Sequence, residues 1–215
     1  MIKNLVTFKL FFLLALTVHA ESNLQKFEGS INLKKETVYD TTFVTIQVKG
    51  DLVRLDEFDS KKIIISILII NLENEKVLAL SPKRKLFYEL KPNRGNQPSK
   101  EDITVLKTEN RMVLDGYSCR QVRVKSISRD SETAFWVAQN NFVFFKSMNK
   151  ILKNIKTDIN IFSYFPDTSG IFPMLTVERT LLRKEKMNVL VTGIKEVVLS
   201  ENLFKVPRDY QKIDQ

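Results

Sequence analysis

The sequence predicts an α+β fold, in which a curled antiparallel sheet carries one main amphipathic helix across its concave face. Short segments of alternating apolar and polar residues recur along almost the whole chain, turn signals separate them, and a single segment has strong helical periodicity. About ten strands in one sheet favour curling into an incomplete barrel. A concave sheet covered by a helix encloses an apolar space, which is a natural site for an oily ligand.

The composition agrees with one packed domain. The chain has 215 residues, of which 43% are hydrophobic and 27% charged, and Gly and Pro are scarce at six each. These values exclude a disordered polymer, a polytopic membrane protein and a collagen-like or linker-rich chain. No internal repeat is visible.

The first twenty residues resemble a secretory signal peptide. Lys3 and Lys9 form a basic start, residues 10–18 are apolar, and Val18-His19-Ala20 places small or compact residues at the cleavage positions. The apolar part is too short to cross a bilayer, although an uncleaved anchor is the alternative. No Cys follows Ala20 to accept the lipid of a bacterial lipoprotein.

We therefore expect an exported protein, periplasmic or secreted and not a lipoprotein, cleaved near Ala20-Glu21. Residues 21–207 are expected to form a single domain, and residues 208–215 a loose tail. Removal of Lys3 and Lys9 leaves 32 basic residues against 25 acidic ones, a net charge of +7. Nucleic acid is disfavoured as a partner because the chain is exported, although its charge alone would allow it. The oligomeric state is left open.

Once the expected signal peptide is removed, the remaining residues can support few kinds of catalysis. The only His is His19, so the mature chain lacks an imidazole base for a Ser-His-Asp or Cys-His relay, and a single Cys cannot complete an ordinary zinc site. No phosphate-cradling or dinucleotide motif is present. Asp56, Glu57 and Asp59 form a carboxylate cluster, which we interpret as a solvated turn rather than a glycosidase pair. We expect no enzyme, catalytic residue, metal or cofactor.

Cys119 lies in a segment that alternates like a strand. A free Cys usually packs as a small apolar residue, so we expect it to be buried. The alternative is a reactive thiol activated by Arg120 and Arg123.

The strands are expected to follow one another as hairpins. Gly50-Asp51 and Asp115-Gly116 are tight-turn signals, and residues 91–100, with two Pro and one Gly, form the clearest loop. The expected strands are 26–33, 42–48, 52–55, 63–70, 76–80, 86–90, 103–107, 111–114, 117–126, 133–137, 174–183 and 187–199.

The segment 63–70 is unusual because it reads IIISILII. It is too short for a membrane helix and too β-branched for a comfortable soluble helix. We interpret it as a strand that is apolar on both faces and needs cover on both. Ile65 and Ile67 are its candidate ligand-binding residues.

The helix is expected over residues 140–156, with Asn140 or Asn141 as its cap. Its apolar residues fall within about a third of the helical wheel, opposite a ridge of lysines. The stripe comprises Phe144, Phe145, Met148, Ile151, Leu152 and Ile155, and the ridge comprises Lys146, Lys150 and Lys153. The helix is interpreted first as a core-covering element, with a movable lid or a membrane-surface helix as alternatives.

The order of several motifs resembles a bacterial envelope family designated domain of unknown function 4412. That family is similar in layout to the lipoprotein carriers LolA and LolB and to the regulator RseB. The motifs are Phe27-Glu28-Gly29, Val48-Lys49-Gly50-Asp51 with Arg54, Leu80-Ser81-Pro82, Lys85-Leu86-Phe87-Tyr88, Leu114-Asp115-Gly116-Tyr117-Ser118-Cys119, Phe135-Trp136-Val137 and the closing 203–210. The resemblance implies an incomplete antiparallel barrel with an apolar inner face, which in the carriers holds acyl chains.

These observations together predict a non-enzymatic, exported binding module for an acyl chain, a lipoprotein or another hydrophobic ligand. The candidate ligand-binding residues are Phe144, Phe145, Met148, Ile151, Leu152, Trp136, Ile65 and Ile67. One alternative is a module for protein interaction or envelope-stress sensing, with an envelope protein as partner. Another is a peripheral binder of anionic membrane lipid through Lys146, Lys150 and Lys153.

Overall fold

The computed structural model describes residues 26–91, 103–155, 162, 165–166 and 169–214. The expected signal peptide lies outside the described residues, as does nearly all of the loop expected at 91–100.

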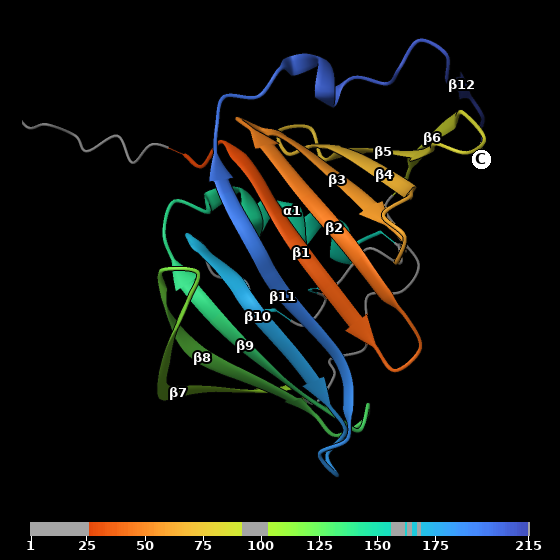
Figure 1. Cartoon of the computed structure of the whole chain (residues 1–215). Helices are drawn as coiled ribbons and strands as arrows, with labels where there is room; N and C mark the ends of the chain where they lie inside the picture. Colours follow the sequence, from red (N-terminus) through yellow and green to blue (C-terminus); the bar gives the residue numbers. More distant parts are fainter. Residues whose placement is uncertain (1–25, 92–102, 156–161, 163–164, 167–168, 215) are drawn as a thin grey trace, which may run out of the picture.

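One sheet of twelve strands dominates the molecule (Figure 1). Its order is β12-β6-β5-β4-β3-β2-β1-β11-β10-β9-β8-β7, and all neighbours pair antiparallel except the short β12, which pairs parallel with β6. The strands are β1 (Gly29–Thr37), β2 (Thr41–Lys49), β3 (Leu52–Phe58), β4 (Ile64–Asn71), β5 (Lys76–Ser81), β6 (Leu86–Leu90), β7 (Ile103–Leu114), β8 (Tyr117–Ser126), β9 (Ser131–Gln139), β10 (Ile171–Arg179), β11 (Glu185–Glu196) and β12 (Gln211–Lys212). The sheet curls and stays open between β7 and β12, so the expected fold class is confirmed.

The hairpin turns form where the sequence places residues that tolerate positive φ. Asp115 and Gly116 have φ values of 47° and 78°, and Gly50 has 56°. These values match the primed turns that suit the twist of antiparallel strands. The two segments expected at 103–107 and 111–114 form one strand, β7, because a register irregularity between Lys107 and Arg111 absorbs the polar residues between them.

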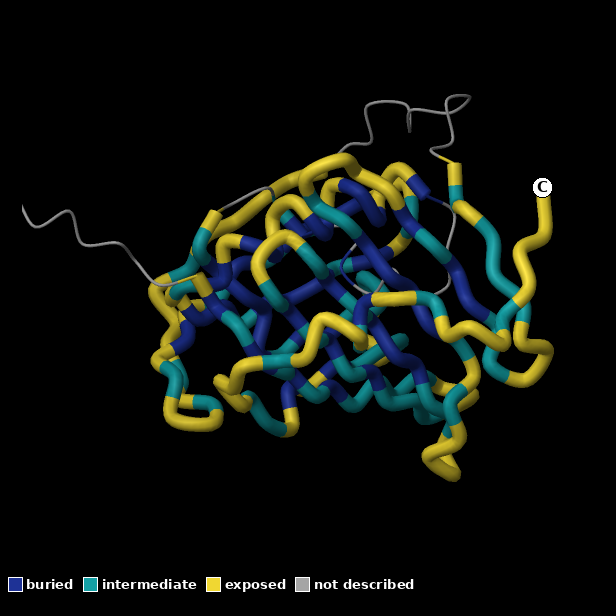
Figure 2. The backbone as a smooth tube through the Cα atoms, turned by 90° about the horizontal axis from the view of Figure 1, so that it is seen from above, coloured by how far each residue is buried: buried dark blue, intermediate teal, exposed yellow. Residues whose placement is uncertain are grey.

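The inner face of the sheet, defined as the face that α1 (Val143–Lys153) covers, carries the main core. Cross-strand neighbours such as Ile31, Ile46 and Leu55 lie on this face and are fully buried. Figure 2 shows the buried residues concentrated in the middle of the molecule, with exposed ones at the turns and edges. Since side chains alternate along a strand, the opposite, outer face takes the residues between them.

β4 is covered on both faces from Ile67 to Ile70, as the apolar run predicts, but its start is not, since Ile65 is 47% exposed. Leu68 and Ile70 belong to the main core, whereas Ile67 and Ile69 belong to a second cluster with Phe204. Phe204 comes from the short 3₁₀ helix η1 (Glu201–Phe204), which follows β11. The C-terminal segment therefore supplies the cover for the outer face of β4.

Residues 208–215 were expected to form a loose tail, but the described part of this segment contacts the sheet instead. Gln211 and Lys212 pair with β6, and Lys85 forms an ion pair with Asp209 at 2.9 Å. Arg54 donates a hydrogen bond to the Leu203 carbonyl, 2.8 Å away. These contacts dock the C-terminal segment onto β3–β6.

The carboxylate cluster was interpreted wrongly as a solvated turn. Asp56 and Glu57 lie in β3 and are 8% and 9% exposed, and only Asp59 lies in the following turn. The Arg54 Nε donates to Asp56 Oδ1 at 2.7 Å, yet burial raises the pKa of Asp56 above its usual value against the lowering effect of Arg54. The strand continues through Asp56 because this carboxylate has a cation beside it.

The cap expected for α1 is also corrected. Phe142 occupies the cap position, and no side chain there hydrogen-bonds to the first turn. Backbone contacts take its place, since the Val143 N–H donates to the Asn141 carbonyl at 2.9 Å.

Candidate ligand-binding interior

Aromatic rings fill the space between α1 and the inner face of the sheet. Phe145 is the central ring, because its centroid lies 4.9 Å from that of Phe172 and 5.2 Å from those of Phe162 and Phe165. Phe135, on β9, meets Phe165 edge-on at 5.1 Å. Helix, strands and the connection between α1 and β10 thus contribute to one aromatic cluster, in which edge-to-face contacts add to the apolar burial.

Two polar atoms lie in this apolar surrounding without a partner. Asn149 is on the buried side of α1, and Thr176 is on β10 opposite Phe135. They are 2% and 0% exposed, and Asn149 Oδ1 and Thr176 Oγ1 have no hydrogen-bond partner within the described part of the chain. A buried polar atom left unpaired costs about 1–3 kcal/mol, so both atoms need an explanation.

Two of the three ridge lysines hold α1 in place. The ammonium group of Lys150 lies 3.1 Å from the Glu75 carboxylate, at the β4–β5 turn. Lys153 donates to the Phe165 carbonyl at 2.8 Å. Lys146 is exposed. The ridge is thus partly used for contacts within the protein.

The structure brings some of the candidate ligand-binding residues together and separates others. Phe144, Phe145, Met148, Ile151 and Leu152 all point into the interior and are buried. The remaining three, Trp136, Ile65 and Ile67, lie outside this group.

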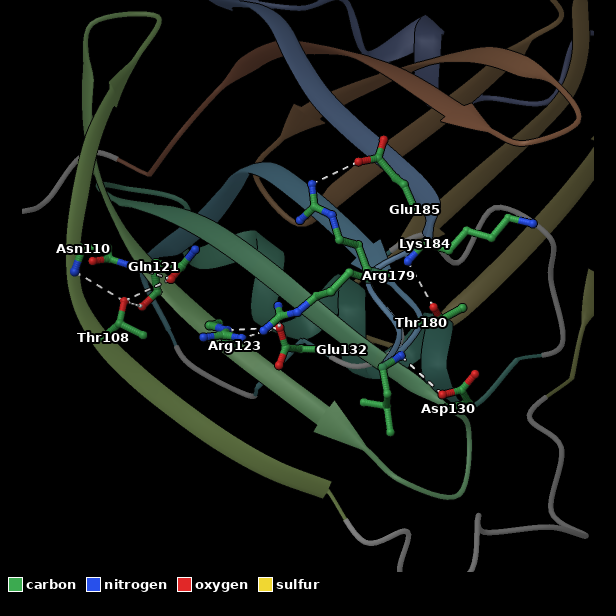
Figure 3. A network of polar contacts seen from close by, with 12 residues as sticks. Thr108, Asn110, Gln121, Arg123, Asp130, Glu132, Arg179, Thr180, Lys184 and Glu185 are labelled. Carbon is green, nitrogen blue, oxygen red and sulfur yellow. Dashed lines mark hydrogen bonds and ion pairs between the residues drawn. The ribbon is translucent and has the colours of Figure 1, made fainter.

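Trp136 is a direct cross-strand neighbour of Gln121, whose side chain lies on the outer face (Figure 3). Since directly opposed residues share a face, Trp136 lies on the side of Gln121, where it is half-buried and packs against the edge of the main core. Ile67 is beneath the C-terminal segment, and Ile65 is 47% exposed.

Sequence reasoning missed several interior residues. The interior also contains Phe142, Phe162, Phe165 and Phe172, beside Phe144 and Phe145 of the helix. Six of the chain's 15 phenylalanines therefore fall within residues 142–172. This local enrichment was a usable signal. No comparable signal marked Asn149 or Thr176, because nothing in a sequence shows that a polar side chain lacks a partner.

Cys119 is buried, as expected. It is 1% exposed, and desolvation raises the pKa of its thiol. A raised pKa keeps the sulfur protonated, which opposes nucleophilic reactivity.

The outer face of β7–β11 carries a polar network (Figure 3). Arg123 pairs with Glu132, which also lies 3.1 Å from Arg183 Nη1. Burial alone would raise the pKa of Glu132, but the hydrogen bond and charge of Arg123, with help from Arg183, lower it. Each carboxylate that Figure 3 draws faces a cation or a backbone amide. The network therefore links neighbouring strands to one another and to the turns between them.

Two further observations concern the described residues. No group of three or more acidic, Cys or His side chains there is arranged to hold a metal ion. None of the helices found there has the length and apolarity to cross a bilayer.

The family model described as Domain of unknown function (DUF4412) matches residues 27–210. A search of curated protein sequences gave no match. Among solved structures, an uncharacterized conserved protein from Thermus thermophilus has a TM-score of 0.52 at 9% identity, and the alignment covers 86% of this chain and 90% of that one. This likeness supports the fold alone.

Weaker likenesses include the following two. PNGF-II has a TM-score of 0.49 at 13% identity, with 86% of this chain and 30% of that chain covered. MucB in complex with MucA(peri) has a TM-score of 0.44 at 8% identity, with 88% and 57% covered.

Proposed function

The chain belongs to the family described as Domain of unknown function (DUF4412), and we propose that it is an exported, non-enzymatic module that binds an acyl chain or another hydrophobic ligand. The ligand, free or part of a lipid or lipoprotein, would lie between α1 and the inner face of the sheet. The family description assigns no activity, so the proposal rests on the interior.

The observation that carries the proposal is the pair of unpartnered polar atoms in an aromatic interior. Asn149 Oδ1 and Thr176 Oγ1 lose their water on folding and gain no hydrogen bond within the described residues. A ligand with an apolar body and a polar head group that accepts from the Thr176 hydroxyl, or donates to Asn149 Oδ1, would restore what they lose.

α1 is suited to be displaced by such a ligand. The ion pair between Lys150 and Glu75 is exposed, and exposed pairs contribute only about 0–1 kcal/mol. An acyl chain inserted beneath α1 would replace the apolar contacts that Phe144, Met148 and Leu152 lose from the sheet. The free energy of opening is then offset by burial of the ligand, at about 25 cal/mol for each Å² of apolar surface.

Binding to anionic membranes through the lysine ridge has less support. Lys150 and Lys153 already have acceptors in Glu75 and the Phe165 carbonyl. Membrane contact would have to compete with these bonds.

The proposal is tested by titrating the protein with cis-parinaric acid, a fluorescent fatty acid. We expect saturable binding that Thr176→Val weakens about three- to tenfold, because a ligand hydrogen bond is lost. Thr42→Val is the matched control, since Thr42 Oγ1 is equally unpartnered but lies beside the β1–β2 turn. Absence of saturable binding, or an equal loss in the Thr42 variant, would contradict the proposal.

A further inference from the structure

The outer face of the sheet contains a hollow that the proposed function does not use. It has a volume of about 350 Å³ and lies over β1, β2, β3 and β11. Its floor and walls include Asn32, Phe43, Thr45, Phe58, Lys62 and Thr192. That volume is within the lower part of the range for small-molecule sites.

A bulge in the sheet forms the hollow. Asn32 faces Gly193 and Leu33 faces Val191, so Thr192 is an extra residue on β11. A Cβ at Gly193 would meet no atom within 4 Å, which shows open space beside Asn32. Bulges often re-aim side chains next to functional sites.

The polar floor presents a hydrogen-bond donor. Thr45 Oγ1 donates to Asn32 Oδ1 at 2.9 Å, and Thr192 Oγ1 donates to the Asn32 carbonyl at 3.3 Å. With Asn32 Oδ1 accepting from Thr45, the Asn32 Nδ2 group remains a donor. No acceptor for Nδ2 is found in the described ranges.

Lys62 adds a positive charge that no carboxylate balances. Its ammonium group lies over the ring of Phe43, and it forms no ion pair with any residue that the structure describes. None of the residues lining the hollow is acidic. Desolvation by its surroundings and the nearby charge of Lys34 lower the pKa of Lys62. A bound anion would therefore stabilise the charged form of its ammonium group.

The turn before β4 fixes the backbone of Lys62, and the contact with Phe43 positions its ammonium group. Its φ is 65°, and its N–H donates to the Asp59 carbonyl at 3.0 Å. Asp59 Oδ1 accepts from the N–H groups of Lys61 and Ile63, which closes the turn. Placement of the cation in advance reduces the entropy lost on binding.

We propose that this hollow binds a small organic carboxylate with an apolar ring or short chain. The carboxylate would accept from Lys62 Nζ and Asn32 Nδ2, and the apolar part would lie against Phe43 and Phe58. A single cation with a single amide donor matches one carboxylate group.

The test is a titration of the full chain with phenylacetate, followed by NMR or calorimetry. We expect saturable binding centred on Phe43, Phe58 and Lys62, and at least tenfold weaker binding of the neutral analogue phenylacetamide and of acetate. Lys62→Gln should weaken binding about tenfold or more, whereas Lys61→Gln should leave it unchanged. Asn32→Asp, an isosteric change, should abolish it by replacing the amide donor with a negative charge.

The inference would be overturned by no saturation up to about 10 mM phenylacetate, by equal affinity for phenylacetamide, or by an equal effect of Lys61→Gln and Lys62→Gln. Competition between phenylacetate and cis-parinaric acid would also overturn it, since it would place both in one site. Unchanged phenylacetate binding in Thr176→Val would support two separate sites.

Discussion

At the scale of single residues, the interior depends most on Phe145. This ring is fully buried and meets three other rings from the α1–β10 connection and β10. Its contacts are long-range in sequence, so one side chain joins the helix to the sheet. Truncation leaves a cavity that surrounding aromatic rings fill only in part.

We therefore predict that Phe145→Ala lowers the free energy of unfolding by about 3–5 kcal/mol. Val143→Ala, on the exposed side of the same helix, is the control and should change it by less than about 0.5 kcal/mol. Urea denaturation monitored by circular dichroism measures both. Similar effects of the two substitutions would show that α1 does not cover the core as described.

Glu28 provides a second prediction, for the dependence of stability on pH. Its pKa is lowered, first because the Leu199 N–H donates to its carboxylate at 3.0 Å, with a further contribution from Lys49, while burial opposes the shift. An acid with a lowered folded-state pKa stabilises the fold above its unfolded pKa. This stabilisation is lost as the pH falls through the folded-state value.

Glu28→Gln should accordingly cost about 1 kcal/mol at pH 7 and much less near pH 3. Glu73→Gln, at the exposed β4–β5 turn, should have little effect at either pH. Urea midpoints at both pH values measure the difference. A cost for Glu28→Gln that is the same at pH 3 and pH 7 would contradict the ionic role.

At the scale of elements, the C-terminal segment is a structural part of the sheet. It covers Ile67 and Ile69 through Phe204, and Arg54 holds the Leu203 carbonyl. The apolar run 63–70 made the need for two-sided cover predictable. The identity of the cover was not predictable, because 203–207 is distant in sequence and carries no pairing signal.

We predict that Phe204→Ala destabilises the protein by about 3 kcal/mol and increases binding of a hydrophobic dye. Lys205→Ala, whose side chain is exposed, should change stability by less than about 0.5 kcal/mol. Thermal unfolding with and without the dye measures both effects. A neutral Phe204→Ala would mean that the segment is not needed as cover.

The start of α1 shows where local signals failed. Asn140 and Asn141 are good capping residues, yet Phe142 takes the cap position because its ring packs with Phe27 and Phe172 in the core. Tertiary burial therefore outweighed a capping contribution of about 1 kcal/mol. We predict that Asn141→Ala changes the unfolding free energy by less than about 0.5 kcal/mol, as measured by urea denaturation. A decrease of about 1 kcal/mol or more in the unfolding free energy would show that Asn141 does cap the helix.

At the scale of the whole molecule, periodicity and turn residues predicted the fold class and nearly every strand. Local alternation and tight turns determine hairpins, and a chain of hairpins becomes one sheet. The interior was predicted in part, since the helical stripe identified Phe144 and Phe145. The unpartnered atoms of Asn149 and Thr176, and the position of Trp136 beside Gln121, depend on long-range packing that no local pattern encodes.

The central claim is that the space beneath α1 accommodates a hydrophobic ligand. Native mass spectrometry of the full-length gene product, isolated from cell envelopes without detergent, tests it most directly. The account predicts a population heavier than the polypeptide by the mass of an acyl-bearing molecule, which organic extraction releases and Thr176→Val reduces. A preparation that has only the polypeptide mass, and remains so after incubation with fatty acid, would contradict it.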